Sequence, residues 1–186
     1  MRSVAFIFFF AALLLLHTAC IQLNIPESRG NRTVEYTLVL PSQFKAPEKK
    51  IAVAEFVSDS PAKFKMLSRQ GTEQQFEPFA KWSQTPSVMV TAAFRKLYGL
   101  DDVQKNADYL LEGDILTFER NLDTKTADLK IVYRFIKRSD RTSVFCKELF
   151  TSVPLKGDTP ADFADAMSKA VAEQAEKIRQ DINSLK

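Results

Sequence analysis

The chain has 186 residues, of which 45% are hydrophobic and 26% are charged, a composition typical of a globular protein with one sizeable core. Its 26 Lys and Arg nearly balance its 23 Asp and Glu, giving a net charge of +3, and basic residues never run longer than a pair. This balance gives no support for nucleic-acid binding or for a polybasic membrane patch, and the five glycines form no phosphate-cradling loop.

The first 20 residues have the pattern of a bacterial lipoprotein export signal. Arg2 precedes an unbroken apolar run over residues 4–16, and small residues then lead to Cys20. The run is too short to cross about 30 Å of hydrocarbon, which takes about 20 helical residues. This pattern predicts cleavage after Ala19 and lipidation of Cys20. The resulting anchor would be firm, because several acyl chains hold a protein at a membrane far more firmly than one chain does.

Two features of this signal depart from the usual pattern. His17 stands three residues before the cysteine, where an aliphatic or small residue is usual, and Arg2 is the sole basic residue ahead of the apolar run. Cleavage by the ordinary signal peptidase and retention as an uncleaved anchor are therefore the competing interpretations. Ile21, rather than Asp, follows the cysteine, which favours a periplasm-facing location on the outer membrane over the inner membrane.

This interpretation divides the chain into a signal peptide (1–19), a lipidated N-terminus and tether (20–32) and a single domain (33–186). The sole histidine, His17, is removed with the signal, so histidine-based catalytic triads and zinc sites are absent from the mature chain. We predict no catalytic residue, no metal and no cofactor. Cys146 lies in an apolar segment without an intrachain partner, which predicts a buried, inert thiol, with an intermolecular disulfide as the alternative.

The first half of the domain is predicted to be mainly extended. Apolar and polar residues alternate over 34–40, a second strand is expected over 51–57, and two extended segments, 63–70 and 73–82, flank Gly71. The second segment contains Phe76, Phe79 and Trp82, which are candidates for contact with a partner or a lipid. The alternative, which we favour for Trp82, is a packing anchor between the first helix and the sheet.

The second half is predicted to contain two helices and three strands. Thr85–Pro86 begins a helix that ends at Gly99, and Thr159–Pro160 begins a long amphipathic helix that runs to the C-terminus. Between them, strands are expected at about 108–120, 128–138 and 143–153, and Gly113 is expected to permit a bulge or the close approach of a helix. The fold class is therefore α+β, a two-layer domain whose mostly antiparallel sheet is covered by two principal helices.

The order of these features resembles the ABC-type transport auxiliary lipoprotein family, the PqiC-like group. The resemblance covers about residues 34–183, and it is carried by extended residues 36–38 and 51–53, Trp82 ahead of a helix, and the run 107–115 leading into Phe118. It implies an accessory subunit beside an ABC transporter permease and ATPase and an MCE-type substrate-binding protein. Such systems move phospholipids or other hydrophobic molecules between the inner and outer membranes, and no catalytic residues come with the family.

An alternative assignment remains open at the level of sequence. Residues 107–113 also resemble a strand of other envelope lipoproteins, including LpoB, the TolB N-terminal domain and CsgG. A regulatory or scaffolding lipoprotein that contacts cell-wall machinery is therefore the alternative function, and a separate lipid carrier is a third. The sequence leaves self-association as a homo-oligomer open.

Overall fold

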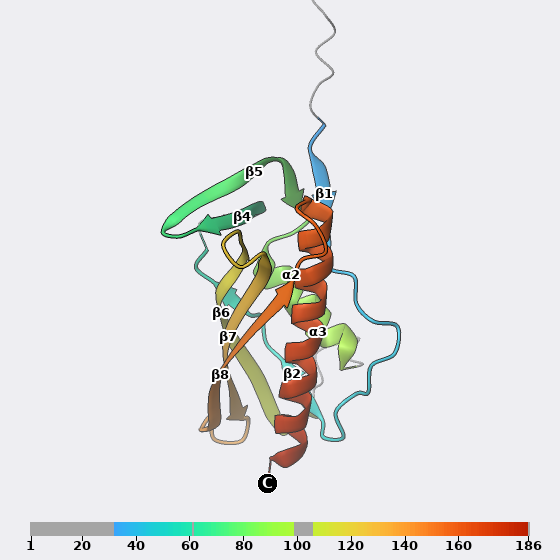
Figure 1. Cartoon of the computed structure of the whole chain (residues 1–186). Helices are drawn as coiled ribbons and strands as arrows, with labels where there is room; N and C mark the ends of the chain where they lie inside the picture. Colours follow the sequence, from blue (N-terminus) through green and yellow to red (C-terminus); the bar gives the residue numbers. More distant parts are fainter. Residues whose placement is uncertain (1–31, 61, 99–105, 186) are drawn as a thin grey trace, which may run out of the picture. The chain divides into compact units, whose positions relative to one another are not determined.

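The structure, a computed structural model, describes residues 32–60, 62–98 and 106–185 (Figure 1). The chain divides into two units, Met1–Arg32 and Thr33–Lys186, and all of the buried core that is described belongs to the second. The predicted cleavage and lipidation positions, Ala19 and Cys20, and the predicted helix end at Gly99 lie outside the described residues. Within the described stretches, no helix is long and apolar enough to cross a membrane.

Three long strands form the main part of the sheet. The strands β6 (Tyr109–Asn121), β7 (Thr126–Lys137) and β8 (Ser143–Pro154) run antiparallel to one another in sequence order, so two hairpins join them. Their bounds lie within two residues of the predicted strands, and the predicted hairpins are confirmed. The alternating apolar positions of β7, such as Leu129 and Ile131, all face the core.

Shorter strands continue the sheet on the other side of β6. The strands β2 (Ile51–Val53) and β3 (Val57–Ser58) pair parallel with its first half, and β4 (Lys65–Gln70) pairs parallel with its end. The strand β5 (Glu73–Trp82) forms an antiparallel hairpin with β4, and β1 (Val34–Tyr36) lies parallel to β5 at the edge. The described part of the sheet has eight strands, with the path β1-β5-β4-β6-β7-β8.

Two predicted strands are shorter in the structure than in the sequence analysis. The predicted strand 34–40 pairs only at its first three residues, because the chain then crosses to the second helix, where the Val39 amide donates a hydrogen bond to the Ser168 hydroxyl. The predicted strand 51–57 is broken between β2 and β3. At this break Phe56 is buried, and its amide donates to the Thr91 hydroxyl rather than to a strand.

Two helices cover one face of the sheet, as Figure 1 shows. The helix α2 (Pro86–Leu97) packs against β2, β3 and β6, whereas α3 (Pro160–Ser184) packs against β7 and β8. A capping box fixes the start of α3, because the Thr159 hydroxyl accepts from the Asp162 amide and the Asp162 carboxylate accepts from the Thr159 amide. The predicted two-layer α+β fold, with a mostly antiparallel sheet and two helices, is confirmed.

The prediction that Cys146 is buried is wrong. Its side chain is exposed, and in the register of the sheet it lies opposite Arg134. The neighbouring residues Phe145 and Leu149 point toward α3 and pack against the core. Because side chains alternate along a strand, Cys146 points to the opposite face, which neither of the described helices covers.

Gly113 is approached by a side chain of the sheet layer and not by a helix. A Cβ atom at Gly113 would lie 2.1 Å from Cε1 of Phe56, so the aromatic ring occupies the space that a side chain would take. The Phe56 ring in turn packs against Phe94 of α2, with centroids 5.0 Å apart. Gly113 thus permits a close approach, as predicted, but the approaching group is Phe56.

Candidate functional site

The structure separates Trp82 from the two phenylalanines that precede it. Trp82 is only 1% exposed, and its ring packs edge-to-face against Phe118 of β6 and Phe163 of α3, at centroid distances of 5.2 and 5.4 Å. It therefore anchors the first turn of α3 to the end of β5. This agrees with the packing interpretation, although the helix involved is α3 and not the first helix.

Phe76 and Phe79 lie on the other side of β5, where they are 41% and 50% exposed. Ala80 and Trp82 are buried, so Phe79 and Lys81 point away from the core. The register pairs Lys81 with Lys65, whose Nζ lies 4.7 Å from the centroid of the Phe76 ring. We call the surface formed by Lys65, Phe76, Phe79 and Lys81 the arm face.

A shallow hollow of about 260 Å³ adjoins the arm face, lined by Phe76, both lysines and Thr33. Lys81 also forms an ion pair with Glu35 of β1, with 3.0 Å between Nζ and Oε1. The chain therefore enters the domain directly beside the arm face. The juxtaposition of aromatic rings and ammonium groups creates an amphipathic surface, in which the ring faces attract the cations.

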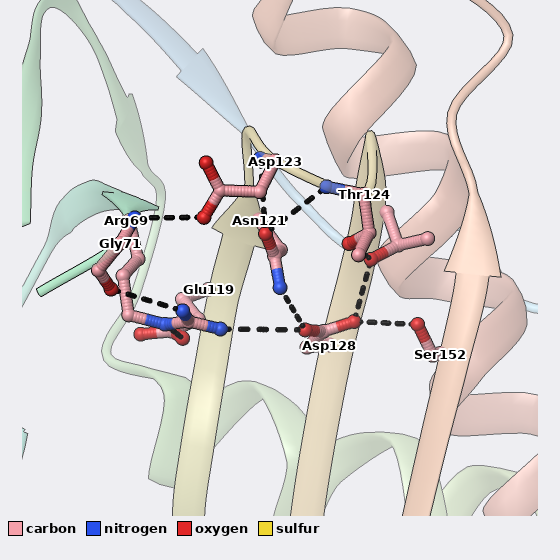
Figure 2. Close-up of polar contacts among 9 residues, drawn as sticks. Arg69, Gly71, Glu119, Asn121, Asp123, Thr124, Asp128 and Ser152 are labelled. Carbon is pink, nitrogen blue, oxygen red and sulfur yellow. Dashed lines mark hydrogen bonds and ion pairs between the residues drawn. The ribbon is translucent and has the colours of Figure 1, made fainter.

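The hairpin that carries the arm face is tied to the main sheet by side chains. The backbone pairing of β4 with β6 extends over only two residue pairs, Ser68 with Arg120 and Arg69 with Asn121. On the face away from the helices, Arg69 Nε donates to Glu119 Oε1 at 2.5 Å, as Figure 2 shows. This hydrogen bond raises the pKa of the Arg69 guanidinium, which therefore stays charged.

Asp128 of β7 extends this tie across the sheet (Figure 2). Its carboxylate accepts hydrogen bonds from Asn121 at 3.1 Å, Thr126 at 2.7 Å and Ser152 at 2.6 Å, and it lies 3.9 Å from a guanidinium nitrogen of Arg69. The cluster thus joins four strands, β4, β6, β7 and β8. Since these buried carboxylates already have their donors, the arrangement is suited to holding strands together rather than to proton transfer.

A second tie lies on the helix-facing side of the same strands. The guanidinium of Arg120 pairs with the Glu77 carboxylate of β5, and its Nε donates to the Ser68 hydroxyl at 3.0 Å. A further guanidinium nitrogen of Arg120 donates to the backbone oxygen of Asp158, just ahead of α3, at 3.1 Å. Arginines on both faces therefore hold the β4–β5 hairpin in a fixed position relative to β6.

The far end of β6 carries a basic hollow, and two of its residues, Lys137 and Arg138, are among the basic residues that the sequence offers as contacts for phospholipid headgroups, with simple solvation as the alternative. It has a volume of about 750 Å³ and is lined by two basic pairs, Lys49–Lys50 and Lys137–Arg138, and by Asp108. The two doublets are the signal that could have revealed it. Arg134, by contrast, lies in ion pairs with Glu112 at 3.3 Å and Asp114 at 2.9 Å.

The described residues contain no cluster of three or more His, Cys, Asp or Glu that could hold a metal ion. Two surface features stand out in the described part of the chain, the amphipathic surface on the braced hairpin and the basic hollow at the opposite end of β6.

Comparison with solved structures places the fold among α+β domains known from crystals. The protein XCC0632 from Xanthomonas campestris, of the family-model DUF330, aligns with a TM-score of 0.69 and 18% identity over 80% of this chain and 95% of its own. The crystal structure of an uncharacterized protein aligns with a TM-score of 0.67 and 7% identity over 81% and 99%. At such identities the likeness shows the fold alone.

The family follows from the sequence match. The model of the ABC-type transport auxiliary lipoprotein component matches residues 65–179, which is more than half of the chain, and the chain belongs to this family. The matched region runs from β4 into α3, so it includes the arm face and both arginine ties. No curated protein sequence matches the chain. As a member of this family, the protein is an auxiliary lipoprotein of an ABC-type transport system, held in the cell envelope by a membrane anchor.

Proposed function

We propose that this lipoprotein serves an ABC transporter that works with an MCE-type substrate-binding protein. Such a system moves phospholipids or other hydrophobic molecules between the inner and outer membranes. The observation that carries the proposal is the family match over residues 65–179, together with the export signal that ends at Cys20. The protein acts through contacts with the MCE-type protein, the permease and the ATPase, and has no catalytic step of its own.

The anchor in this proposal is the lipid on Cys20, which becomes the N-terminus after cleavage behind Ala19. Residues 20–32 tether the folded domain, residues 33–186, to the periplasmic side of the outer membrane. A role in binding is supported by the two ion pairs that brace the β4–β5 hairpin against β6, Arg69 with Glu119 and Arg120 with Glu77. They hold the hairpin in a fixed position, as a surface that positions a partner requires.

The test is in-cell cross-linking of the tagged protein, followed by purification from mild detergent and mass spectrometry. Recovery of an MCE-type protein with its permease and ATPase is the expected result. Cross-links between copies of the chain would report self-association in the same experiment. Recovery of cell-wall synthases without any transporter component would contradict the proposal and favour the regulatory or scaffolding alternative.

A matched pair of variants tests the anchor separately. The substitution Cys20→Ala is expected to release the protein from the membrane fraction, because the only acylated residue is lost. Cys146→Ser changes the other cysteine, which is exposed on β8, and is expected to leave the protein in the membrane fraction. Membrane association that survives Cys20→Ala would contradict anchoring through this residue.

A further inference from the structure

We infer that the arm face rests on the surface of the lipid bilayer to which the protein is anchored. The partner that this surface contacts is a membrane whose phospholipids include anionic headgroups. The inference rests on the proposed anchoring at Cys20, and it adds a second membrane contact, made by the folded domain itself.

The side chains of the arm face have the chemistry of the membrane interface. Phe76 and Phe79 are 41% and 50% exposed, and apolar side chains such as phenylalanine enter the boundary between headgroups and acyl chains in proteins that lie on a membrane. Lys65 and Lys81 flank them with ammonium groups. Lys81 is paired with Glu35, so the charge that attracts anionic headgroups comes mainly from Lys65. Because Lys65 already lies on the Phe76 ring, the charge and the aromatic surface would approach a bilayer together.

The aromatic surface is large enough for a shallow contact with a bilayer. A fully exposed phenylalanine offers roughly 200 Å², so the exposed parts of Phe76 and Phe79 provide about 180 Å². Two rings that dip into the headgroup region are sufficient, because the anchor already holds the protein at the membrane.

The position of the arm face beside the start of the domain provides the second argument. Thr33 lines the hollow next to Phe76, and β1 pairs with β5 from Val34 onward. Only residues 21–32 separate Cys20 from Thr33, and these 12 residues span about 40 Å at full extension and about 20 Å on average if flexible. A short tether of this length gives an effective concentration in the millimolar range, so weak lipid affinity is sufficient.

The rigidity of the hairpin determines what this contact would do. Arg69 with Glu119 and Arg120 with Glu77 brace the hairpin against β6 on both faces of the sheet. The basic hollow begins at the opposite end of β6, which at about 3.3 Å per residue lies roughly 40 Å away. Contact of the arm face with the bilayer would therefore direct the basic hollow away from the membrane and toward the periplasm.

The test is co-sedimentation of the non-lipidated mature chain (residues 20–186, with Cys20→Ser) with large phospholipid vesicles. The lipid range extends to about 10 mM, because the tether makes millimolar affinity sufficient. We expect binding to vesicles with phosphatidylglycerol and phosphatidylethanolamine, and weaker binding to phosphatidylcholine alone. Far-UV circular dichroism and the urea midpoint confirm that each variant is folded.

Matched variants separate the arm face from the rest of the surface. The double variant Phe76→Ser and Phe79→Ser is expected to lower the vesicle partition coefficient about tenfold or more. Phe150→Ser is the control, because Phe150 is 55% exposed but lies on β8 at the other edge of the sheet, and it should leave the coefficient within about twofold. Lys65→Gln with Lys81→Gln should remove the preference for anionic vesicles.

Three results of the vesicle assay would overturn the inference. The parent chain could fail to bind, or the Phe150 control could lose as much binding as the arm-face variant. In the third result, binding is lost only when Lys49, Lys50 and Lys137 are changed to Gln. If the arm-face variant instead lost its cross-links to transporter subunits while still binding vesicles, the surface would be a protein-docking site. The vesicle assay contains no transporter and no anchor, so its result is independent of the proposed function.

Discussion

The contact between Gly113 and Phe56 allows a test of how tightly the two layers of the domain are packed. In a Gly113→Ala variant, the new Cβ would lie 2.1, 2.4 and 2.9 Å from three carbon atoms of the Phe56 ring. Ordinary contact begins at 3.4 Å, so the ring must retreat by about 1.3 Å. Its retreat is opposed by Phe94 behind it and by the hydrogen bond from the Phe56 amide to the Thr91 hydroxyl.

The expected cost follows from this geometry. Overpacking of a well-packed core costs about 1–3 kcal/mol, and the short distances at Gly113 favour the upper end, about 3 kcal/mol. For a domain of this size, a loss of about 3 kcal/mol lowers Tm by about 6–12 °C. Urea unfolding of the non-lipidated mature chain, followed by circular dichroism, measures the free energy of unfolding directly.

Two comparisons isolate the clash from other effects of the substitution. The first comparison is Gly71→Ala, which strains the backbone without a clash, because Gly71 has a φ of +56° and no atom lies within 4 Å of a new Cβ. The backbone strain alone should cost about 1 kcal/mol. The second is Gly113→Ala in a Phe56→Ala background, where the clashing ring is absent. There the alanine should cost about 0.5 kcal/mol or less, because the ring with which it would clash is gone. An equal cost of Gly113→Ala in both backgrounds would show that the clash with Phe56 does not cause the loss.

Three further predictions concern the ties, the free thiol and the helix cap. Arg69→Met should destabilise the domain by about 2 kcal/mol, because it leaves the buried Glu119 carboxylate without its cation. The double variant Arg69→Met with Glu119→Leu should recover most of this loss. An unchanged urea midpoint for the single variant would contradict the role of the tie. Cys146 should react with a thiol reagent in the native state at the rate of an unfolded control, whereas protection until unfolding would contradict its exposure. The hydrogen bond from the Thr159 hydroxyl lowers the pKa of Asp162, so its stabilising effect is present above the ordinary carboxyl pKa of about 4 and is lost as the pH falls through the lowered value. Asp162→Asn should therefore be less stable than the parent at pH 7, and the difference should shrink as the pH is lowered. A difference that does not depend on pH would contradict the assignment.

The elements with strong periodicity were predictable from the sequence alone. The apolar stripe of α3 and the alternation along β7 identify their buried faces, because these periods match the geometry of a helix and a strand. The Thr–Pro pairs at residues 85–86 and 159–160 likewise mark both helix starts. Edge pairing was less predictable, since β1 ends where a tertiary hydrogen bond from Val39 to Ser168 takes over.

The candidate site was predictable only in part. The aromatic residues of β5 were recognisable in sequence, and Trp82 was favoured as a packing anchor, but the exposure of Phe76 and Phe79 on one face was not predictable. A change of register in the β4–β5 pairing shifts which side chains of β5 face the core, and such an irregularity has no local signature. The arginine ties also join residues about 40 to 60 positions apart, for which a single sequence contains no pairing signal.

The α+β class and the order of the principal elements were evident in the sequence, because they depend on composition and on local periodicity. The export signal at residues 1–19 is a prediction of the same kind. Which face of β8 is covered became clear only from the tertiary packing, as Cys146 illustrates. Both faces of β8 carry a mixture of apolar and charged side chains, so the local pattern is ambiguous until α3 packs on one of them. The same packing buries Trp82 and leaves Phe76 and Phe79 exposed on the side of β5 where Thr33 lies.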